Sequence, residues 1–112
     1  MTIAQSLHTI DDERCRLATA TLEHIGKRWT GGILLALGRG ATRFREILHL
    51  VDGLSDRMLS VRLRELERDG LVTRAVEPTT PVSVRYGLTT RGKELLAAMA
   101  PLVAYSERYA TD

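Results

Sequence analysis

The segment 55–69 carries four arginines on an apolar pattern typical of a short amphipathic helix. A guanidinium group is planar and bonds two acceptors side by side, which suits it to guanine edges and phosphates. On a helical wheel, three leucines lie within about 60° of one another and form the side expected to be buried: Leu59, Leu63 and Leu66. The opposite side is expected to face outward and carries Arg57, Val61, Arg64 and Arg68, with Ser60 at the border.

The position of a residue along such a helix indicates what it would contact on DNA. The N-terminal turns of a recognition helix enter the major groove. Base contacts are therefore expected from the first turns, at Ser55, Arg57, Met58, Ser60 and Val61. Arg64 and Arg68 lie further along and are expected at phosphates. Acidic residues interleave with the arginines, which favours a second interpretation, a helix that is only a solvated surface.

Capping residues and turns indicate how this helix is held. Ser55 is expected to cap it, and Gly70 is expected to end it in a left-handed conformation. Upstream, apolar spacing predicts helices at about 11–25, 30–38 and 43–51, the last two capped by Thr30 and Thr42. A tight Asp-Gly turn then joins the third helix to the arginine-bearing one, which predicts a helix-turn-helix.

The pattern changes after residue 70. The stretches "LVTRAV" and "VSVRYGL" alternate, are rich in β-branched residues and flank "EPTTP", which predicts a β-hairpin. The stretch "TTRGKELLAAMAPLVAYSERY" predicts a closing helix in which Pro101 should cause a kink or break. Its apolar stripe consists of Leu95, Leu96, Met99, Leu102 and Val103. The expected fold class is therefore mainly α with a small β-hairpin wing, a winged helix-turn-helix.

Further DNA contacts are expected outside the arginine-bearing helix. The hairpin offers Arg74, Arg85 and, at its tip, Thr79 and Thr80, which could reach backbone or minor groove. Arg43 is placed for a phosphate at the start of its own helix.

Composition limits the other possibilities. The 112 residues suit one domain, and the net charge of +2 is too small to indicate nucleic-acid binding by itself. There is no apolar run of 18 residues, so no membrane span is expected, and the N-terminal stretch lacks the pattern of a secretory signal. A single cysteine excludes an internal disulfide and suits a reducing cytoplasm.

The sequence gives no reason to expect an enzyme. Its histidines, His8, His24 and His49, are scattered without partners at metal-ligand spacing, so no metal is expected. It contains no phosphate loop, nucleophile elbow or dinucleotide fingerprint, so no cofactor is expected.

Several ordered motifs together resemble the HxlR family of winged-helix transcriptional regulators. They are "IGKRWTGGILLAL", "RFREI", "LSDRMLSVRLRELERDGLVTR" and "PVSVRYGLTTRGKEL", and the resemblance covers about residues 15–105. It implies a homodimer, assembled through the first and last helices, that binds an inverted-repeat operator in double-stranded DNA. The single domain, 1–112, would then comprise dimer and support helices at about 11–38, a helix-turn-helix at 42–70, a wing at 71–88 and a dimerisation helix at 89–109.

Cys15 invites a further comparison. Together with the following Gly26-Lys27-Arg28-Trp29, it resembles the branch of the family that senses electrophiles or oxidants. Flanking arginines and a nearby helix start favour the reactive thiolate, whereas a lone cysteine can equally be a small buried apolar residue. Because no second cysteine is present, sensing would require a link between two Cys15 thiols or capping by a small molecule.

Two functions from different classes follow. The first is a dimeric DNA-binding transcriptional regulator, with a possible oxidant or electrophile acting at Cys15. The alternative is a winged-helix protein–protein adaptor, in which Arg57, Arg64 and Arg68 bind an acidic partner.

Overall fold

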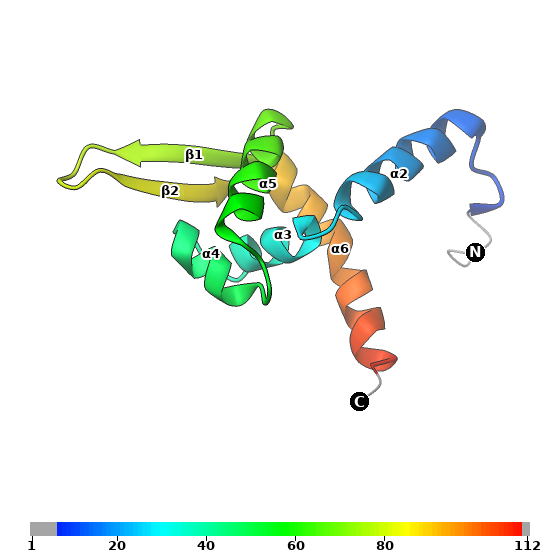
Figure 1. Ribbon diagram of the computed structural model, residues 1–112. Helices are drawn as coiled ribbons and strands as arrows, with labels where there is room; N and C mark the ends of the chain where they lie inside the picture. Colours follow the sequence, from blue (N-terminus) through cyan, green and yellow to red (C-terminus); the bar gives the residue numbers. More distant parts are fainter. Residues whose placement is uncertain (1–6, 111–112) are drawn as a thin grey trace.

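The computed structural model describes residues 7–110, so the first six and last two residues of the expected domain lie outside the described part. The chain forms α2 (Asp12–Ile25), α3 (Thr30–Gly38), α4 (Phe44–Leu50), α5 (Asp56–Arg68), β1 (Val72–Glu77), β2 (Ser83–Leu88) and α6 (Thr90–Arg108). The helix-turn-helix is α4 and α5, and the hairpin forms the wing (Figure 1). The expected winged helix-turn-helix is confirmed.

The three leucines of α5 do form its buried side. Leu59, Leu63 and Leu66 are at most 2% exposed and pack in one core with α3 and α4. Among their neighbours there, Ile33 and Leu34 of α3 and Ile47 of α4 are fully buried. Burying such a side chain contributes roughly 1.5–3 kcal/mol. This core fixes the direction in which the opposite face of α5 points.

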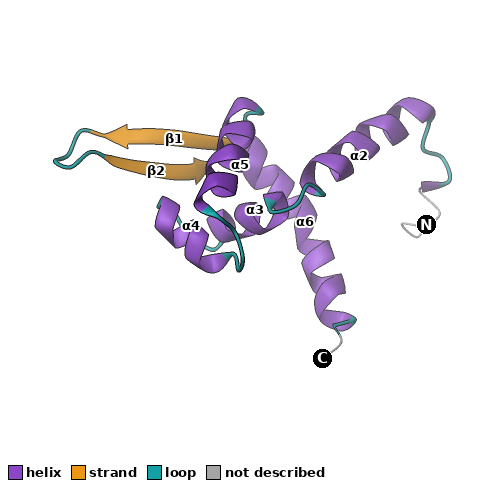
Figure 2. Ribbon diagram, viewed as in Figure 1, coloured by secondary structure: helices purple, strands orange, loops and turns teal. Residues whose placement is uncertain are grey.

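The wing is a two-stranded antiparallel sheet on one side of this body (Figure 2). Its register runs from Val72 opposite Leu88 to Glu77 opposite Ser83. Val72 is buried at the base, whereas most of β1 is exposed. The N–H of Tyr86 donates to the carbonyl of Thr42 at 2.7 Å, which joins the wing to the residues before α4.

Two capping expectations are confirmed and two are wrong. The Ser55 hydroxyl accepts from the Met58 N–H at 3.1 Å, and Gly70 ends α5 with a φ of +76°. Thr30 does not cap α3, because it is already the first helical residue and is buried; the cap position is Trp29, whose φ is +81°. Thr42 does not cap α4 either, because the cap position is Arg43.

The start of α4 is stabilised from inside the helix. The Glu46 carboxylate accepts from the N–H of Arg43 at 2.8 Å and from that of Thr42 at 3.1 Å. The backbone hydrogen bond from Thr42, followed in size by the one from Arg43, lowers the pKa of Glu46. The glutamate at the third helical position thus binds N–H groups at and before the cap position, a different contact from the threonine cap that was expected.

Pro101 does not break the last helix. α6 runs continuously from Thr90 to Arg108, although proline has no N–H to donate to the carbonyl of Ala97. Both residues are exposed, so water can satisfy that carbonyl. Of the expected kink or break, the break is absent, because the lost bond lies on the solvated side of the helix.

The two ends of the chain extend beyond the body on the side away from the wing (Figure 1). No residue of α2 is buried, and Leu17 and Leu22 are 63% and 64% exposed. The apolar stripe of α6 divides in two: Met99 is buried in the core, whereas Leu102 is 54% exposed.

Candidate nucleic-acid interface

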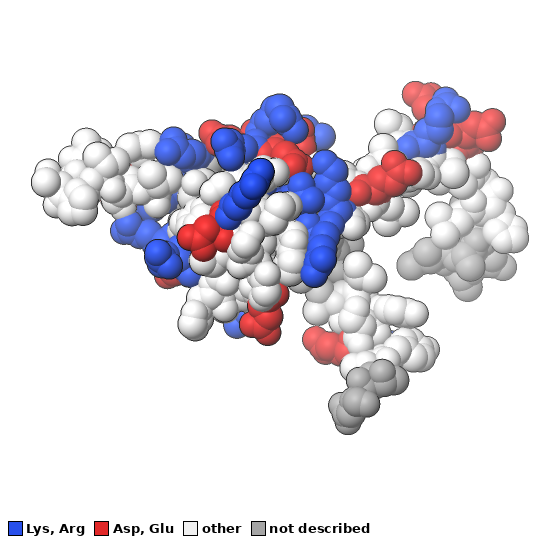
Figure 3. Space-filling view, viewed as in Figure 1, with Lys and Arg blue, Asp and Glu red and all other residues white. Residues whose placement is uncertain are grey.

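The outer face of α5 carries the arginines that the helical wheel placed there. Arg57, Arg64 and Arg68 are exposed, opposite the buried leucines. In Figure 3, Lys and Arg side chains gather over α5 and the adjoining body, whereas the tip of the wing carries no charged side chain. In this view cations therefore cover α5, the adjoining body and the part of the wing nearest to it, and further ones lie on α2.

A recess lies between α5 and the wing. Its walls are Ser60, Arg64 and Glu67 from the helix and Arg74 and Tyr86 from the strands. Arg64 folds back on its own helix, since its Nε donates to the Ser60 carbonyl at 3.3 Å. Because this bond leaves the remaining guanidinium N–H groups available, Arg64 can still bind a phosphate there.

Polar contacts orient the arginines near the wing. Arg43 donates from Nη1 to the Ser83 hydroxyl, which links α4 to β2. Arg85 pairs with Glu77 across the hairpin and donates from Nη1 to the Thr42 hydroxyl at 3.5 Å. Because Glu77 offsets the charge of Arg85, this arginine would bind a phosphate strongly only after giving up its ion pair with Glu77.

The remaining expected site residues differ in how freely their side chains can contact DNA. Thr79 and Thr80 are exposed at the tip, although the Thr79 hydroxyl donates to the Pro81 carbonyl at 2.8 Å. The Ser55 hydroxyl is occupied by its capping bond. Met58 is half-buried against the core, which limits the part of its side chain that can reach a base. The exposed members of the expected set are Arg57, Arg64, Arg68, Arg74, Thr79, Thr80 and Arg85.

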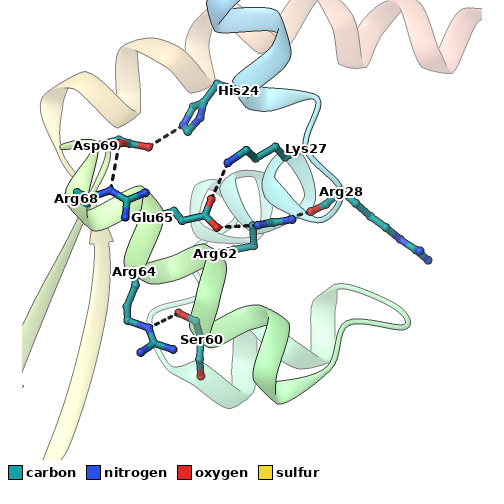
Figure 4. A network of polar contacts seen from close by, with 9 residues as sticks. All are labelled: His24, Lys27, Arg28, Ser60, Arg62, Arg64, Glu65, Arg68 and Asp69. Atoms are coloured by element: carbon teal, nitrogen blue, oxygen red, sulfur yellow. Dashed lines mark hydrogen bonds and ion pairs between the residues drawn. The ribbon is translucent and has the colours of Figure 1, made fainter.

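One of the four arginines of α5 does not face outward. Arg62 is only 17% exposed, donating from Nη1 to Glu65 at 2.7 Å and from Nε to the Arg28 carbonyl at 3.0 Å. Lys27 binds the other oxygen of Glu65 at 3.0 Å (Figure 4). The hydrogen bond from Lys27, followed by that from Arg62, lowers the pKa of Glu65 below its usual value.

The inward direction of Arg62 was not predicted from the sequence, although the helical wheel indicates it. Arg62 lies about 60° from Leu59, beside the buried leucines and away from Arg57 and Arg64. A second contact lies at the end of the helix, where His24 Nε2 is 3.4 Å from the Asp69 carboxylate (Figure 4). The two flanks of α5 therefore differ: one bears exposed arginines, whose contacts are within or next to their own helix, and the other is attached to residues 24–28.

Cys15 lies on α2, and its side chain is exposed. The Thr19 hydroxyl donates to its carbonyl at 2.7 Å, a bond within the helix. An exposed thiol does not fit the interpretation of a buried apolar residue within one chain. The first turn also contains Asp12 and Glu13, so the arginines beside Cys15 are not its only charged neighbours.

The described residues give no sign of other kinds of site. Within residues 7–110, no three potential metal-ligating side chains come together. No helix in that range is long and apolar enough to cross a bilayer.

Comparisons with known proteins agree with this geometry. The model of the HxlR-like helix-turn-helix family matches residues 24–112. The HTH-type transcriptional regulator YodB of Bacillus subtilis is 38% identical over 95 residues, which cover 85% of each chain. The uncharacterised HTH-type transcriptional regulator YvaP of the same bacterium is 40% identical over 100 residues, 89% of each chain.

Two solved structures are similar in fold. Diamide-treated YodB from Bacillus subtilis has a TM-score of 0.70 and 35% identity, covering 94% of this chain and all of that one. The redox regulator HypR in its oxidized form has a TM-score of 0.78 and 33% identity, covering 85% of this chain and 98% of that one.

Proposed function

The chain belongs to the HxlR-like helix-turn-helix family and is a DNA-binding transcriptional regulator of that type, and on this premise we propose that it binds an inverted-repeat operator as a homodimer. The observation that carries the proposal is α2, a helix of 14 residues without one buried residue. Most of the stability of a helix in a protein comes from packing an apolar face. A second copy of the chain would supply the surface that α2 lacks.

The apolar residues available for this contact lie on two helices. α2 exposes Leu17 and Leu22, and the end of α6 exposes Leu102, Val103, Tyr105 and Tyr109. Exposed apolar side chains grouped in this way are typical of a protein–protein interface. Residues 11–38 and 89–109 would thus form the dimer and its support, around a helix-turn-helix at 42–70 and a wing at 71–88.

Each protomer would place α5 in the major groove. Arg57, Ser60 and Val61 would read bases from the first turns, with smaller parts for Ser55 and Met58. Phosphate contacts would come from Arg43, Arg64 and Arg68, and the wing would reach backbone or minor groove through Arg74, Arg85, Thr79 and Thr80. This division is supported by the position of Arg64 and Arg68, which are exposed on the outer face of α5 beyond the residues assigned to bases, and by Arg64, which lines the recess beside the wing.

We also propose that Cys15 responds to oxidants or electrophiles. Its exposure on the dimer helix supports this, as does the likeness to structures of diamide-treated YodB and oxidized HypR. Oxidation would join the Cys15 sulfurs of two protomers and pass two protons and two electrons to a quinone, leaving a hydroquinone. A quinone could instead add to one thiolate, forming a carbon–sulfur bond. Either product would change how two α2 helices pack.

A titration with DNA tests the function and separates it from the adaptor alternative. The probe is the duplex upstream of the chain's own gene, followed by fluorescence anisotropy at several salt concentrations. A DNA-binding dimer loses affinity steeply and linearly on a log–log plot as salt rises. A protein–protein adaptor would bind no duplex even at low salt, and that result would refute the proposal.

A further inference from the structure

The linker between α2 and α3, residues 26–29, contacts α5 at its centre. Lys27 Nζ binds Glu65 Oε2 at 3.0 Å, and the Arg28 carbonyl accepts from Arg62 Nε at 3.0 Å. Arg62 also binds Glu65 Oε1 at 2.7 Å. Each oxygen of Glu65 thus accepts from a different cation, and Arg62 uses two of its nitrogens for two partners. These four residues form one connected group, which we name the linker network: Lys27, Arg28, Arg62 and Glu65.

The contacts on either side of the linker extend this attachment to both ends of α5. Before the helix, the Trp29 ring packs on the turn at Gly53, where a Cβ would lie 3.4 Å from its Cη2. Trp29 has a φ of +81°, which a residue with a Cβ keeps only where its surroundings fix it. After the helix, His24 lies against Asp69. Residues 24–29 therefore follow α5 from its preceding turn to its C-cap.

This attachment decides where α2 points. Because α2 buries no residue against its own chain, little besides its base can hold its direction. At that base, Ile25 is only partly buried against the core. The polar contacts of the linker network, together with the contact of His24 with Asp69, connect this base to α5. In Figure 4, Lys27 of the linker and Arg62 of α5 both point toward Glu65.

We propose that Arg62 and Glu65 are positioning residues, which hold α5 at a fixed angle to α2 and thereby set the half-site spacing that the dimer accepts. The inference rests on the proposed dimer, in which α2 lies at the two-fold axis. Neither residue would touch DNA, since each is 17% exposed and both lie on the flank turned toward residues 24–28. Their effect would pass through the angle between the reading helix and the dimer helix.

The test uses operators that differ only in the distance between half-sites. One has its half-sites one helical turn apart, and the others contain one or two extra base pairs, each turning the second half-site by about 35°. Wild-type protein should prefer the first operator. In Glu65→Gln the side chain keeps its size but loses the charge and one acceptor, so the angle is less restricted. The ratio of affinities should fall about three- to tenfold.

Two further variants separate geometry from charge. Glu94→Gln also removes one carboxylate, from an exposed residue that makes no ion pair in the described part of the chain and lies about two turns of α6 before the exposed apolar residues assigned to the dimer contact, and should leave the ratio unchanged. Arg62→Lys keeps the charge and can bind Glu65, but its single nitrogen cannot also reach the Arg28 carbonyl in the same geometry. Its ratio should fall between those of wild type and Glu65→Gln.

The fluorescence of Trp29, the sole tryptophan, reports on the linker without DNA. Acrylamide should quench it more in Glu65→Gln than in wild type or Glu94→Gln. Equal quenching in all three, or an unchanged spacing ratio in Glu65→Gln, would overturn the positioning role alone. A wild-type protein that is monomeric and shows no spacing preference would refute the proposed dimer and the spacing role together.

Discussion

Replacing Arg57 by Ala tests the reading face of α5 most directly. Arg57 is exposed in the first turn and makes no hydrogen bond or ion pair within residues 7–110, so its loss should not affect folding. A bidentate contact to a base contributes about 1–3 kcal/mol, which corresponds to roughly a five- to 150-fold weaker operator complex. The variant should also discriminate less at one base pair, because the lost contact is to a base edge.

The assay is fluorescence anisotropy with the operator, a set of single-base variants and a random duplex, with thermal unfolding as the check on folding. Lys93→Ala removes the same charge from an exposed position in the first turn of α6, before the exposed apolar residues assigned to the dimer contact, and should change operator affinity little. Arg64→Ala should instead weaken all duplexes alike and flatten the salt slope by about one unit, as expected for a phosphate contact. If Arg57→Ala remains folded and binds the operator with unchanged affinity and selectivity, Arg57 does not read a base as proposed.

Three other outcomes are expected. Leu22→Glu places a charge on the exposed apolar face of α2 and should shift the protein from dimer to monomer in sedimentation; a stable dimer with full operator affinity would contradict the assigned interface. Cys15→Ser should keep operator binding and lose any change in affinity caused by a quinone, whereas a response retained in this variant places the signal elsewhere. Glu65→Gln should lower the free energy of unfolding at pH 7. Because Lys27 and Arg62 hold the pKa of Glu65 below its ordinary value of 4.5, the difference is complete above that pH and disappears as pH falls through the lower folded value, measurable by urea unfolding from pH 7 to pH 3.

The fold could be predicted where one local pattern determines one element. The leucine spacing of α5, the cap at Ser55 and the stop at Gly70 each depend on residues within a few positions. The errors at Thr30 and Thr42 came from a competition between neighbours. At α3 the left-handed Trp29 occupies the cap position, and at α4 the cap position is Arg43, whose N–H is bound by the Glu46 carboxylate. The residue types alone do not show which neighbour occupies the cap position.

The residues of the candidate site also fall into those that a local pattern predicts and those that depend on distant contacts. The outward direction of Arg57 and Arg64 follows from the period of the helix, which the sequence contains. The inward attachment of Arg62 depends on a carbonyl 34 residues earlier in the chain, at Arg28, and on Lys27 reaching the same glutamate. Such contacts exist only once α3 and α5 have packed together. A wheel can place Arg62 beside the leucines but cannot supply its partners.

The distribution of charge explains how a chain with a net charge of only +2 can present a basic face. On the flank of α5 facing the linker, Glu65 is matched by Lys27 and Arg62, and Asp69 faces His24. Those carboxylates lie on the side of the helix away from Arg57 and Arg64. Because attraction between charges weakens with distance and screening, the outward arginines keep most of their field. Glu65 and Asp69 therefore lower the total charge and hold the helix in place, while Arg57 and Arg64 form no ion pair within residues 7–110.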